Sequence, residues 1–212
     1  MKDQRDNRRE YAAHWLRRAN LGRDPLEQFQ RWFAEAVDAG IKDATAMALA
    51  TADDQGMPSV RIVLLKHFDK AGFCWYTDYR SQKGRELAAN PQASCVFHWR
   101  ELDRQVRIAG AVEKLDAAAA DAYFDSRPEE SRFSAAASRQ SAPVDGRHTL
   151  EARVAELRGR FPDGRVPRPA EWGGYRLAPR LYEFWQGRAG RLHDRFRFTR
   201  AADGWVTERL QP

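Results

Sequence analysis

Hydrophobic and polar positions follow two different periods along the chain. Between residues 24 and 40 the apolar side chains recur at helical spacing. This stripe comprises Leu26, Phe29, Trp32, Phe33, Ala36 and Val37. Asp24 is suited to the N-cap of such a helix, Pro25 to its first position, and Gly40 to its end. The pattern predicts one helix over 24–40 that packs its stripe into a core.

From residue 45 to residue 115 the pattern changes to short apolar runs separated by turn signals such as DDQGMP and DKAG. The runs are TAMALAT, SVRIVLLKHF, GFCWYTD, ASCVFHW and RQVRIAGAVEKL. They predict five strands of an antiparallel sheet or barrel. A short helix, SQKGRELAAN, is predicted between them.

Helices return after this region, and strands complete the chain. Helices are predicted over about 116–125, 127–138 and 149–161, with Ser126 as the cap of the second. Strands are predicted over about 174–186, 191–199 and 204–209. Alternation along 191–199 leaves Leu192 on the core side. The opposite face would carry Arg191, His193, Arg195 and Arg197, either as a binding row or as a solvated basic edge.

Together these elements predict an α+β protein that is mainly β, a β-barrel with flanking helices. The first 20 residues are polar, so residues 1–20 are expected to form a mobile N-terminal arm. No repeat or linker divides the remainder, and residues 21–212 are expected to form a single domain.

Charge and cysteine content narrow the classes of partner and location. The chain has 36 Lys and Arg against 30 Asp and Glu, and its net charge of +6 favours an anionic partner. The arginines are scattered, which argues against a nucleic-acid arm.

No apolar run is long enough to span a membrane, and the N-terminus does not resemble a secretory signal. Cys74 and Cys95 lie in apolar runs without metal-ligand spacing, which predicts two buried free thiols, with a disulfide as the alternative, and a cytoplasmic location.

Basic side chains at three places could bind anions. Arg61 and Lys66 flank four apolar residues in RIVLLKH, and their odd separation would point them to opposite faces of one strand. Two anions on two sides would explain this arrangement, whereas two charges at the ends of a strand are the simpler alternative. Ser81, Gln82 and Lys83 open a helix whose free N–H groups could bind a phosphate, or they are an ordinary helix start.

The third place is the junction YFDSRPEES between two predicted helices. Tyr123, Arg127 and Ser131 could present a phenol, a guanidinium and a hydroxyl to a phosphate. A capping serine with a surface arginine is the alternative. Gln105 and Gln140, the latter followed by Ser141, could bind the polar edge of a heteroaromatic ring, although structural roles are as reasonable.

In their order along the chain, these segments resemble the pyridoxine (pyridoxamine) 5′-phosphate oxidase family. The matching segments are RREY, RIVLLKHFD, WYTDYRSQKGRELAANP, RQVRIAGAVEKL, YFDSRPEES, SRQSA and EFWQGRAGRLHDRFRF. They extend from about residue 8 to the C-terminus. Each motif is modest alone, but the ordered set, with WQG shortly before RLHDR, is specific.

The resemblance implies a fold and an activity. The expected fold is an FMN-binding split β-barrel, and the expected assembly is a homodimer with two active sites at the subunit interface. The implied reaction converts pyridoxine 5′-phosphate and pyridoxamine 5′-phosphate to pyridoxal 5′-phosphate. O2 is the acceptor, and H2O2 is released, with NH3 from the amine. Nucleic acid, membrane and metal are not implied.

The resemblance also implies roles for individual residues. The FMN phosphate would be bound by Arg61, Lys83 and Ser141, beside Gln82, which stands where many members carry arginine. The flavin would be lined by Ile62, Val63, Leu64, Leu65, Lys66, Tyr76, Thr77, Gln105 and Gln140, and by Trp185 and Arg195 from the second subunit. The substrate phosphate would be bound by Lys66, Tyr123, Arg127 and Ser131. Arg191 and His193 would lie over the substrate ring as catalytic residues, and a segment with Arg8 and Tyr11 would close over the site.

Three points stay open in the sequence. Either Arg191 or His193 could abstract a proton. A related split-barrel flavin oxidoreductase with another substrate is one alternative function. A basic binding module for nucleic acid or pyridoxal phosphate, without turnover, is the other.

Overall fold

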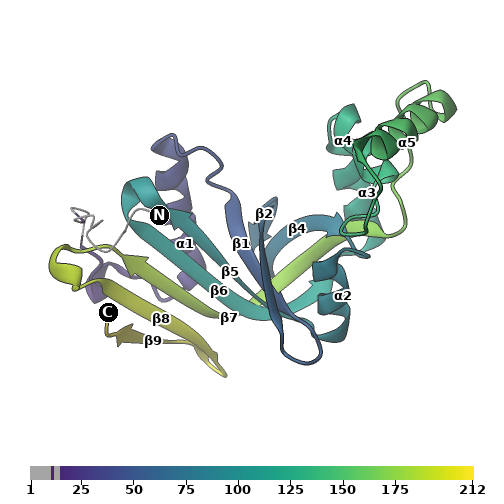
Figure 1. Ribbon diagram of the computed structural model, residues 1–212. Helices are drawn as coiled ribbons and strands as arrows, with labels where there is room; N and C mark the ends of the chain where they lie inside the picture. Colours follow the sequence, from purple (N-terminus) through teal and green to yellow (C-terminus); the bar gives the residue numbers. More distant parts are fainter. Residues whose placement is uncertain (1–10, 12–14) are drawn as a thin grey trace, which may run out of the picture.

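Residues 11 and 15–212 are described by the computed structural model (Figure 1). Within that part of the chain, nine strands form one curled antiparallel sheet. The strands are β1 (Ala46–Ala52), β2 (Pro58–Leu64), β3 (His67–Asp69), β4 (Gly72–Asp78), β5 (Gln92–Trp99), β6 (Arg104–Lys114), β7 (Trp172–Gln186), β8 (Asp194–Ala201) and β9 (Gly204–Leu210). The helices are α1 (Pro25–Asp38), α2 (Gln82–Ala89), α3 (Ala117–Ser126), α4 (Glu129–Ala137) and α5 (Arg147–Arg160), with short 3-10 turns η1 (Arg18–Asn20), η2 (Arg100–Leu102) and η3 (Ala189–Arg191).

The sheet is closed into a half-barrel by a connection of two residues. In the strand order β2-β1-β5-β6-β7-β4-β3, β2 and β3 lie at opposite edges, yet only Leu65 and Lys66 separate them in the chain. The Leu65 N–H donates to the Thr45 carbonyl (2.9 Å), and the Lys66 N–H donates to the Cys74 carbonyl (2.9 Å). Successive residues therefore join both edges, which requires the sheet to curl. The predicted split β-barrel is confirmed.

Helix α1 covers one face of the sheet and supplies much of the core (Figure 1). Its N-cap is Asp24, whose carboxylate accepts from the Leu26 N–H (2.9 Å), as expected. Phe29 is fully buried at the centre of an aromatic cluster formed by Phe33, Phe68, Phe73, Phe97 and Trp99. The predicted stripe is wrong at one position, because Val37 lies at its edge and is 52% exposed.

Helices α3, α4 and α5 form an arm at one end of the molecule, whereas the C-terminus lies at the other end (Figure 1). The arm has a small core of its own, composed of Phe124, Phe133, Val166 and Trp172. The predicted cap between α3 and α4 is wrong. Ser126 is the last residue of α3 and its hydroxyl donates to the Tyr123 carbonyl, whereas Pro128 precedes α4.

Two of the predicted strands differ from the structure. The run SVRIVLLKHF forms β2 and β3, so strand alternation does not extend from Arg61 to Lys66. The strand predicted over 191–199 begins only at Asp194, because Gly190 and Arg191 both have left-handed backbone angles (φ of 63° and 62°) and form a turn. Leu192, predicted to face the core, is therefore 74% exposed. Alternation holds from Asp194 onward.

Most of the predicted N-terminal arm, with Arg8, lies outside the described residues. In the described part, Leu16 is buried in the main core. The division into an arm and one domain stays a prediction. Cys74 and Cys95 are buried and free, as expected. Among the described residues, no helix is both long and apolar enough to span a membrane.

The aromatic cluster gives a test of the packing of α1. Phe29→Ala should lower the free energy of unfolding by about 3–5 kcal/mol, because it leaves a cavity among large rings. Val37→Ala, on the exposed side of the same helix, should change it by less than about 0.5 kcal/mol. Urea denaturation measures both values. Equal losses in the two variants would mean that α1 packs in another orientation.

Candidate functional site

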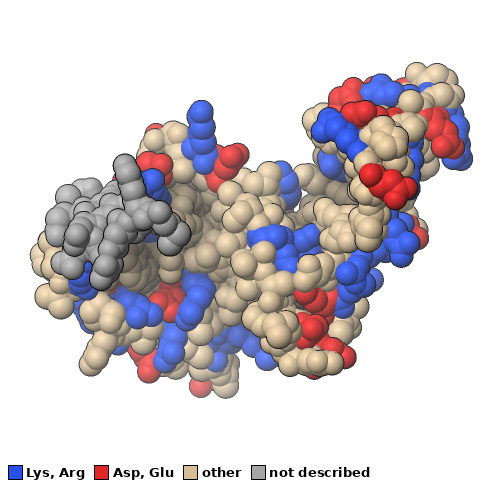
Figure 2. Space-filling view, in the orientation of Figure 1, with Lys and Arg blue, Asp and Glu red and all other residues tan. Residues whose placement is uncertain are grey.

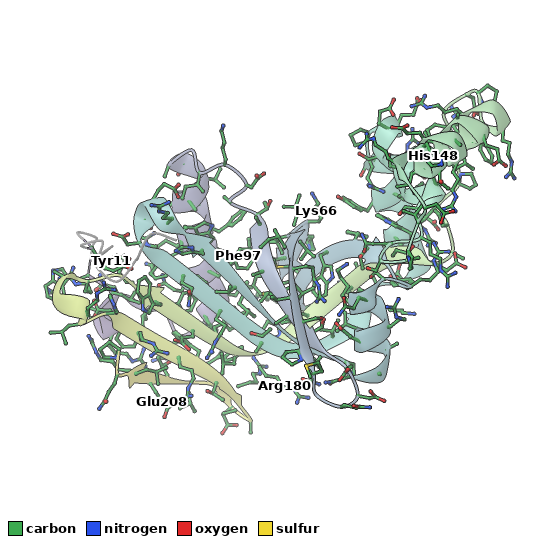
Figure 3. The ribbon with its side chains drawn as sticks, in the orientation of Figure 1. Tyr11, Lys66, Phe97, His148, Arg180 and Glu208 are labelled. Carbon is green, nitrogen blue, oxygen red and sulfur yellow. The ribbon has the colours of Figure 1, made fainter. Side chains whose placement is uncertain are left out.

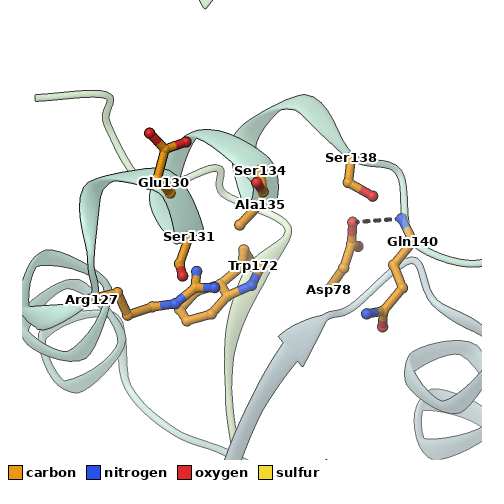
Figure 4. Close-up of a pocket in the computed structure, with 9 residues that line it drawn as sticks. All are labelled: Asp78, Arg127, Glu130, Ser131, Ser134, Ala135, Ser138, Gln140 and Trp172. Atoms are coloured by element: carbon orange, nitrogen blue, oxygen red, sulfur yellow. Dashed lines mark hydrogen bonds between the residues drawn. The ribbon is translucent and has the colours of Figure 1, made fainter. Parts of the chain in front are cut away.

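A pocket of about 430 Å³ lies between the barrel and the helical arm. It is lined by Ile62, Val63, Leu64, Lys66, Tyr76, Thr77, Lys83, Tyr123, Arg127, Pro128, Ser131, Gln140 and Trp172. All of these except Pro128 and Trp172 were predicted from the sequence. An adjoining cavity of about 350 Å³ shares Arg127, Ser131, Gln140 and Trp172 with it (Figure 4). Basic side chains gather on the surface between barrel and arm (Figure 2).

Lys83 provides a buried cation in the first turn of α2. Its side chain is held by neutral groups, because Nζ donates to Gln140 Oε1 (2.7 Å) and to Thr77 Oγ1 (3.2 Å). Burial, reinforced by the nearby Arg61, lowers the pKa of Lys83 to about 8. A buried ammonium group with neutral partners is costly, and an anion beside it would remove that cost. Lys83 is therefore suited to bind a phosphate.

Arg61 lies behind the pocket lining, in an ion pair with Glu86 (Nη2–Oε2 3.3 Å). Its guanidinium also donates to Thr51 and Ser59. Burial alone would raise the pKa of Glu86, but hydrogen bonds from Ser59, Thr51 and Gln82, together with Arg61, lower it to about 2. Sequence reasoning missed Glu86. Its position four residues after Gln82, which donates to it (2.9 Å), was the available signal.

A stack of three aromatic rings forms one wall of the pocket. Tyr76 and Tyr123 lie 3.9 Å apart between ring centroids, and Trp172 lies 5.7 Å from Tyr76. The Arg127 guanidinium lies over Trp172 at 4.7 Å. Arg127 Nη1 is buried and has no hydrogen-bond partner among the described residues. A guanidinium held by an aromatic face, with an unused donor, is suited to a second anion.

Two predicted pocket residues lie elsewhere. Leu65 is buried in the core, where its backbone closes the barrel. Ser141 is exposed, with a left-handed backbone (φ of 68°), and follows Gln140. The Gln140 N–H donates to Asp78 Oδ2 (3.4 Å), which holds this segment against the end of β4 (Figure 4).

The remaining predicted residues gather at the far end of β7. Tyr11, Trp185 and His193 form an aromatic cluster, with ring centroids separated by 4.7–5.6 Å. Gly187 permits this approach, because a Cβ there would lie 2.5 Å from Tyr11 Cδ1. Trp185 is thirteen residues beyond Trp172 on the same strand, a distance of about 40 Å in extended chain. Figure 3 shows Tyr11 and Lys66 far apart.

Neighbouring strands add two more predicted residues to this far cluster. Gln105 of β6 and Arg195 of β8 are both paired with Trp185 in the sheet. Arg195 is held by Glu183 (Nη2–Oε1 2.6 Å). Gln105 was expected to line the flavin together with Gln140. Gln105 lies beside the last residues of β7, whereas Gln140 lines the pocket at the first residues of β7. One chain thus brings the predicted residues together in two separate groups.

A buried carboxylate fixes the turn that carries Arg191 and His193. Asp194 is 2% exposed and accepts from the Leu16 N–H (3.2 Å). Its other oxygen accepts from Arg209, and Arg188 lies 3.9 Å away. The Arg188 guanidinium covers the Trp15 ring at 3.5 Å. Trp15 and Leu16 are therefore held against the start of β8 and the turn before it.

The fold and the pocket define the class of protein. A curled half-barrel with flanking helices is the split β-barrel, and it is shared with a structure from Nostoc punctiforme described as a pyridoxamine 5′-phosphate oxidase-related, FMN binding protein. That structure has a TM-score of 0.70 and 17% identity, over 87% of this chain and 97% of that one. The likeness shows the fold.

Sequence comparison identifies the family. Residues 33–161 match the model described as pyridoxamine 5′-phosphate oxidase. Residues 172–212 match the pyridoxine 5′-phosphate oxidase C-terminal dimerisation region. A pyridoxine/pyridoxamine 5′-phosphate oxidase of Ralstonia pickettii is 54% identical over 98% of each chain, and that of Rubrobacter xylanophilus is 50% identical over 97% of this chain and 94% of its own. The chain belongs to the pyridoxine/pyridoxamine 5′-phosphate oxidase family.

A solved structure with a different ligand is also similar. PhzG from Burkholderia lata, in complex with tetrahydrophenazine-1-carboxylic acid, has a TM-score of 0.90 and 33% identity, over 96% of this chain and all of that one. The family models and the curated relatives confirm the family resemblance inferred from the sequence motifs.

The buried Lys83 has a measurable effect on stability. Its pKa is lowered from 10.5 to about 8, so the unfolded chain binds this proton more tightly than the folded one. Below about pH 8 Lys83 is charged in the folded, ligand-free protein, and its burial lowers the free energy of unfolding by the full amount. This loss of stability disappears as the pH rises to 10.5, because the folded protein then loses the proton. Lys83→Met should therefore stabilise ligand-free protein at pH 7, by up to about 1 kcal/mol once the lost hydrogen bonds to Gln140, Thr77 and Ser81 are subtracted.

The control for this change is Lys66→Met, which replaces an exposed lysine of the same pocket and should not stabilise the protein. Urea denaturation at several pH values measures both variants. A Lys83→Met protein that is less stable than wild type at pH 7, or whose gain does not shrink toward pH 10.5, would contradict the buried-cation assignment.

Proposed function

We propose that this protein is an FMN-dependent oxidase that converts pyridoxine 5′-phosphate and pyridoxamine 5′-phosphate to pyridoxal 5′-phosphate. O2 is the acceptor, and H2O2 is released, with NH3 from the amine. The observation that carries this proposal is the presence of two separate cationic positions in one pocket. Lys83 lies in the first turn of α2 and Arg127 at the junction of α3 and α4, beside stacked rings. Two phosphorylated aromatic ligands, a cofactor and a substrate, match that arrangement.

The residues present fit FMN. Lys83 is a buried cation in need of an anion, and we assign the cofactor phosphate to it, with Arg61 and Ser141 in support. The exposed side chains of β2, with Tyr76, Thr77 and Gln140, would line the ring system, and Leu65 would support β2 from the core. Gln82 contributes no charge, so binding of the phosphate depends on Lys83 and Arg61. When bound, FMN supplies a ring that accepts a hydride and passes electrons to O2.

The chain itself binds and orients the substrate. We assign the substrate phosphate to Arg127, whose buried Nη1 has no partner among the described residues, with Lys66, Tyr123 and Ser131 around it. Two fixed phosphates define the distance between the two aromatic systems, and such positioning is the main contribution a protein makes to hydride transfer.

The far cluster completes the site only if a second copy supplies it. In the proposed homodimer, Trp185, Arg195 and Gln105 of one subunit reach the flavin of the other, and Tyr11, Arg191 and His193 reach the substrate ring. Two observations support this assembly. Residues 172–212 match a dimerisation region. The edge strand β2 exposes a row of apolar side chains, Val60, Ile62 and Leu64; Ile62 and Leu64 line the pocket, and a partner subunit that completes the site would cover the part of the row that a ligand leaves open.

A second candidate follows from the similarity to PhzG. A related split-barrel flavin oxidoreductase could act on a reduced polycyclic carboxylate of the kind bound in that structure. The higher identity to the B6 phosphate oxidases, 54% and 50% against 33% for PhzG, and the gathering of Lys66, Tyr123 and Ser131 around Arg127 favour a phosphorylated substrate instead. The third possibility, a binding module without turnover, has no structural observation in its favour. We place the enzyme in the cytoplasm, where two unpaired thiols remain reduced.

The test is a peroxide assay of the purified, FMN-loaded protein. Pyridoxine 5′-phosphate and pyridoxamine 5′-phosphate should each give H2O2, whereas unphosphorylated pyridoxine should give little. Added FMN should raise the melting temperature of ligand-free protein by mass action. Peroxide from tetrahydrophenazine-1-carboxylic acid alone would support the second candidate. Binding of pyridoxal 5′-phosphate without any turnover would support the third.

Arg127→Ala separates the two phosphate assignments. Loss of one charge-assisted hydrogen bond should lower kcat/KM for either B6 phosphate about 10- to 150-fold, with FMN content unchanged. The matched control is Arg147→Ala, which removes an exposed arginine of the arm paired only with Glu151 among the described residues and should leave kcat/KM unchanged. A variant that loses FMN but uses substrate normally would reverse the assignment of the two phosphates.

A further inference from the structure

Strand β7 changes its neighbour in the middle of the sheet, and this change leaves a gap beside it. Up to Leu177 the strand pairs with β4, and from Leu181 onward it pairs with β8. Between these points, Ala178 and Pro179 pair only with β6, next to a register shift. Pro179 is suited to an open edge, because proline has no N–H that a neighbouring strand would have to accept. The gap is therefore a consequence of the strand pairing.

The gap opens into a cavity of about 400 Å³, which we call the gap cavity. Lys70 borders it from the turn between β3 and β4, and Arg200 and Trp205 border it from the β8–β9 hairpin. Asp24, at the start of α1, and Tyr182 of β7 also line it. None of its lining residues lines the pocket or the adjoining cavity between barrel and arm. A ligand bound here would occupy a separate site.

A buried phenol lines the gap cavity. Tyr182 is 3% exposed and packs edge-on against Trp205, with ring centroids 5.4 Å apart. Burial and the Asp24 carboxylate raise the pKa of Tyr182, whereas Arg200 opposes them, so the hydroxyl lies within reach of both charges and stays protonated. No hydrogen bond joins this hydroxyl to any residue in the described part of the chain. The Tyr182 O–H is therefore a donor that is available to an acceptor in the cavity.

Two cations border the gap cavity without a carboxylate partner. Neither Lys70 nor Arg200 forms an ion pair with another described residue. The Arg200 guanidinium lies over the Trp205 ring at 5.2 Å. The turn that carries Lys70 is held by Asp69, whose carboxylate accepts from the Ala71 N–H (2.8 Å). The two cations thus lie on opposite sides of the gap in the sheet.

The only carboxylate that lines the gap cavity already has a structural role. Asp24 caps α1, and its Oδ1 accepts from the Leu26 N–H (2.9 Å). Together with Lys70 and Arg200 it leaves the lining with one net positive charge. Negative charge in the cavity is therefore favoured over positive charge.

We propose that the gap cavity binds a small aromatic anion, with its carboxylate or phosphate between Lys70 and Arg200 and its ring beside Trp205. The Tyr182 hydroxyl would donate to an oxygen of the anionic group. Hydrogen bonds between cations and an anion are strong, and the two aromatic side chains offer a surface for a planar ring. The volume lies in the range of small-molecule sites. Because this cavity shares no residue with the pocket, it does not depend on the proposed function.

The indole NMR signals of two tryptophans distinguish this cavity from the pocket. Trp205 lines the gap cavity and Trp172 lines the pocket, and each of the seven indole N–H signals is assigned by its loss in a Trp→Phe variant. Phenyl phosphate and benzoate are titrated into the purified full-length protein at constant ionic strength. At least one should shift the Trp205 signal to saturation, with a Kd on the order of 1 mM. The tighter of the two identifies the anionic group.

Probes that carry half of this chemistry serve as controls. Inorganic phosphate has the anion without the ring, and benzyl alcohol has the ring without the anion. Each should bind at the Trp205 signal at least about tenfold more weakly than phenyl phosphate or benzoate, whichever binds more tightly. A Trp205 signal that neither aromatic anion moves, or shifts confined to Trp172, would overturn the proposal.

Two variants test the assigned contacts with the tighter of the two probes. Lys70→Ala removes an exposed cation, and Tyr182→Phe removes a hydroxyl while keeping the buried ring. Each should weaken binding about tenfold or more, as expected for the loss of one hydrogen bond to a charged group. The matched control is Arg180→Ala, which removes an exposed arginine of the same stretch of β7 that does not line the cavity. Equal weakening in Arg180→Ala and Lys70→Ala would show diffuse attraction to surface charge instead of a site.

Asp24→Asn tests the sign of the charge that the cavity accepts. Asparagine is as good an N-cap as aspartate, so α1 stays capped while one negative charge leaves the lining. The same aromatic anion should bind more tightly to this variant than to wild type. Weaker binding would contradict an anion site.

Discussion

The functional architecture depends on the closure of the sheet at Leu65 and Lys66. The chain joins the two edge strands β2 and β3 directly, and two successive backbone N–H groups in the connection donate to their different neighbours, at Thr45 beside β1 and at Cys74 of β4. A buried sheet edge without such partners would cost several unsatisfied backbone groups. Closure places β2 beside β4 and the start of α2, and the pocket forms where these elements meet the helical arm.

The second organising feature is the length of β7. Its first residues pair with β4 at the pocket, and its last residues pair with β8 at the far cluster. One continuous strand therefore holds two groups of functional side chains apart. Under the proposed function, neither group alone holds all the residues assigned to the cofactor and the substrate. The division makes sense for a chain whose site is completed by a second copy.

Two buried cations in the pocket lower the stability of the ligand-free protein and are suited to bind anions. Lys83 is buried with neutral hydrogen-bond partners, and Arg127 has a buried N–H without a partner among the described residues. Cations in such positions destabilise a folded protein in the absence of an anion. Glu86 forms an ion pair with Arg61. Phosphorylated ligands would therefore stabilise the protein as well as occupy its site.

Local patterns predicted much of this structure because they depend on neighbours in the sequence. The stripe of α1, the start of α2 at Ser81 and the apolar runs of the sheet are all of this kind. The motifs shared with the family identified most of the pocket lining. Trp172 was missed because it enters the pocket from a strand distant in sequence, without any local motif.

The errors have physical causes as well. The alternation rule placed Leu192 in the core because nothing in RAGRLHDR reveals that Arg191, a residue other than glycine, adopts a left-handed turn. The same rule placed Arg61 and Lys66 on one strand. The connection of two residues, Leu65 and Lys66, lies within an unbroken apolar run, and nothing in the sequence marks it. The sequence also did not reveal that Gln105 and Gln140 lie at opposite ends of β7, because that separation is a property of the sheet.

The central claim, that each site combines the pocket of one chain with the far cluster of another, is tested most directly by a heterodimer. One differently tagged chain carries Lys66→Ala and Arg127→Ala, and the other carries Arg191→Ala and His193→Ala. Each homodimer should be nearly inactive. The purified heterodimer should recover about half of wild-type peroxide production, because one of its two sites then contains only wild-type residues. Activity no higher than that of the two inactive homodimers would contradict the shared site.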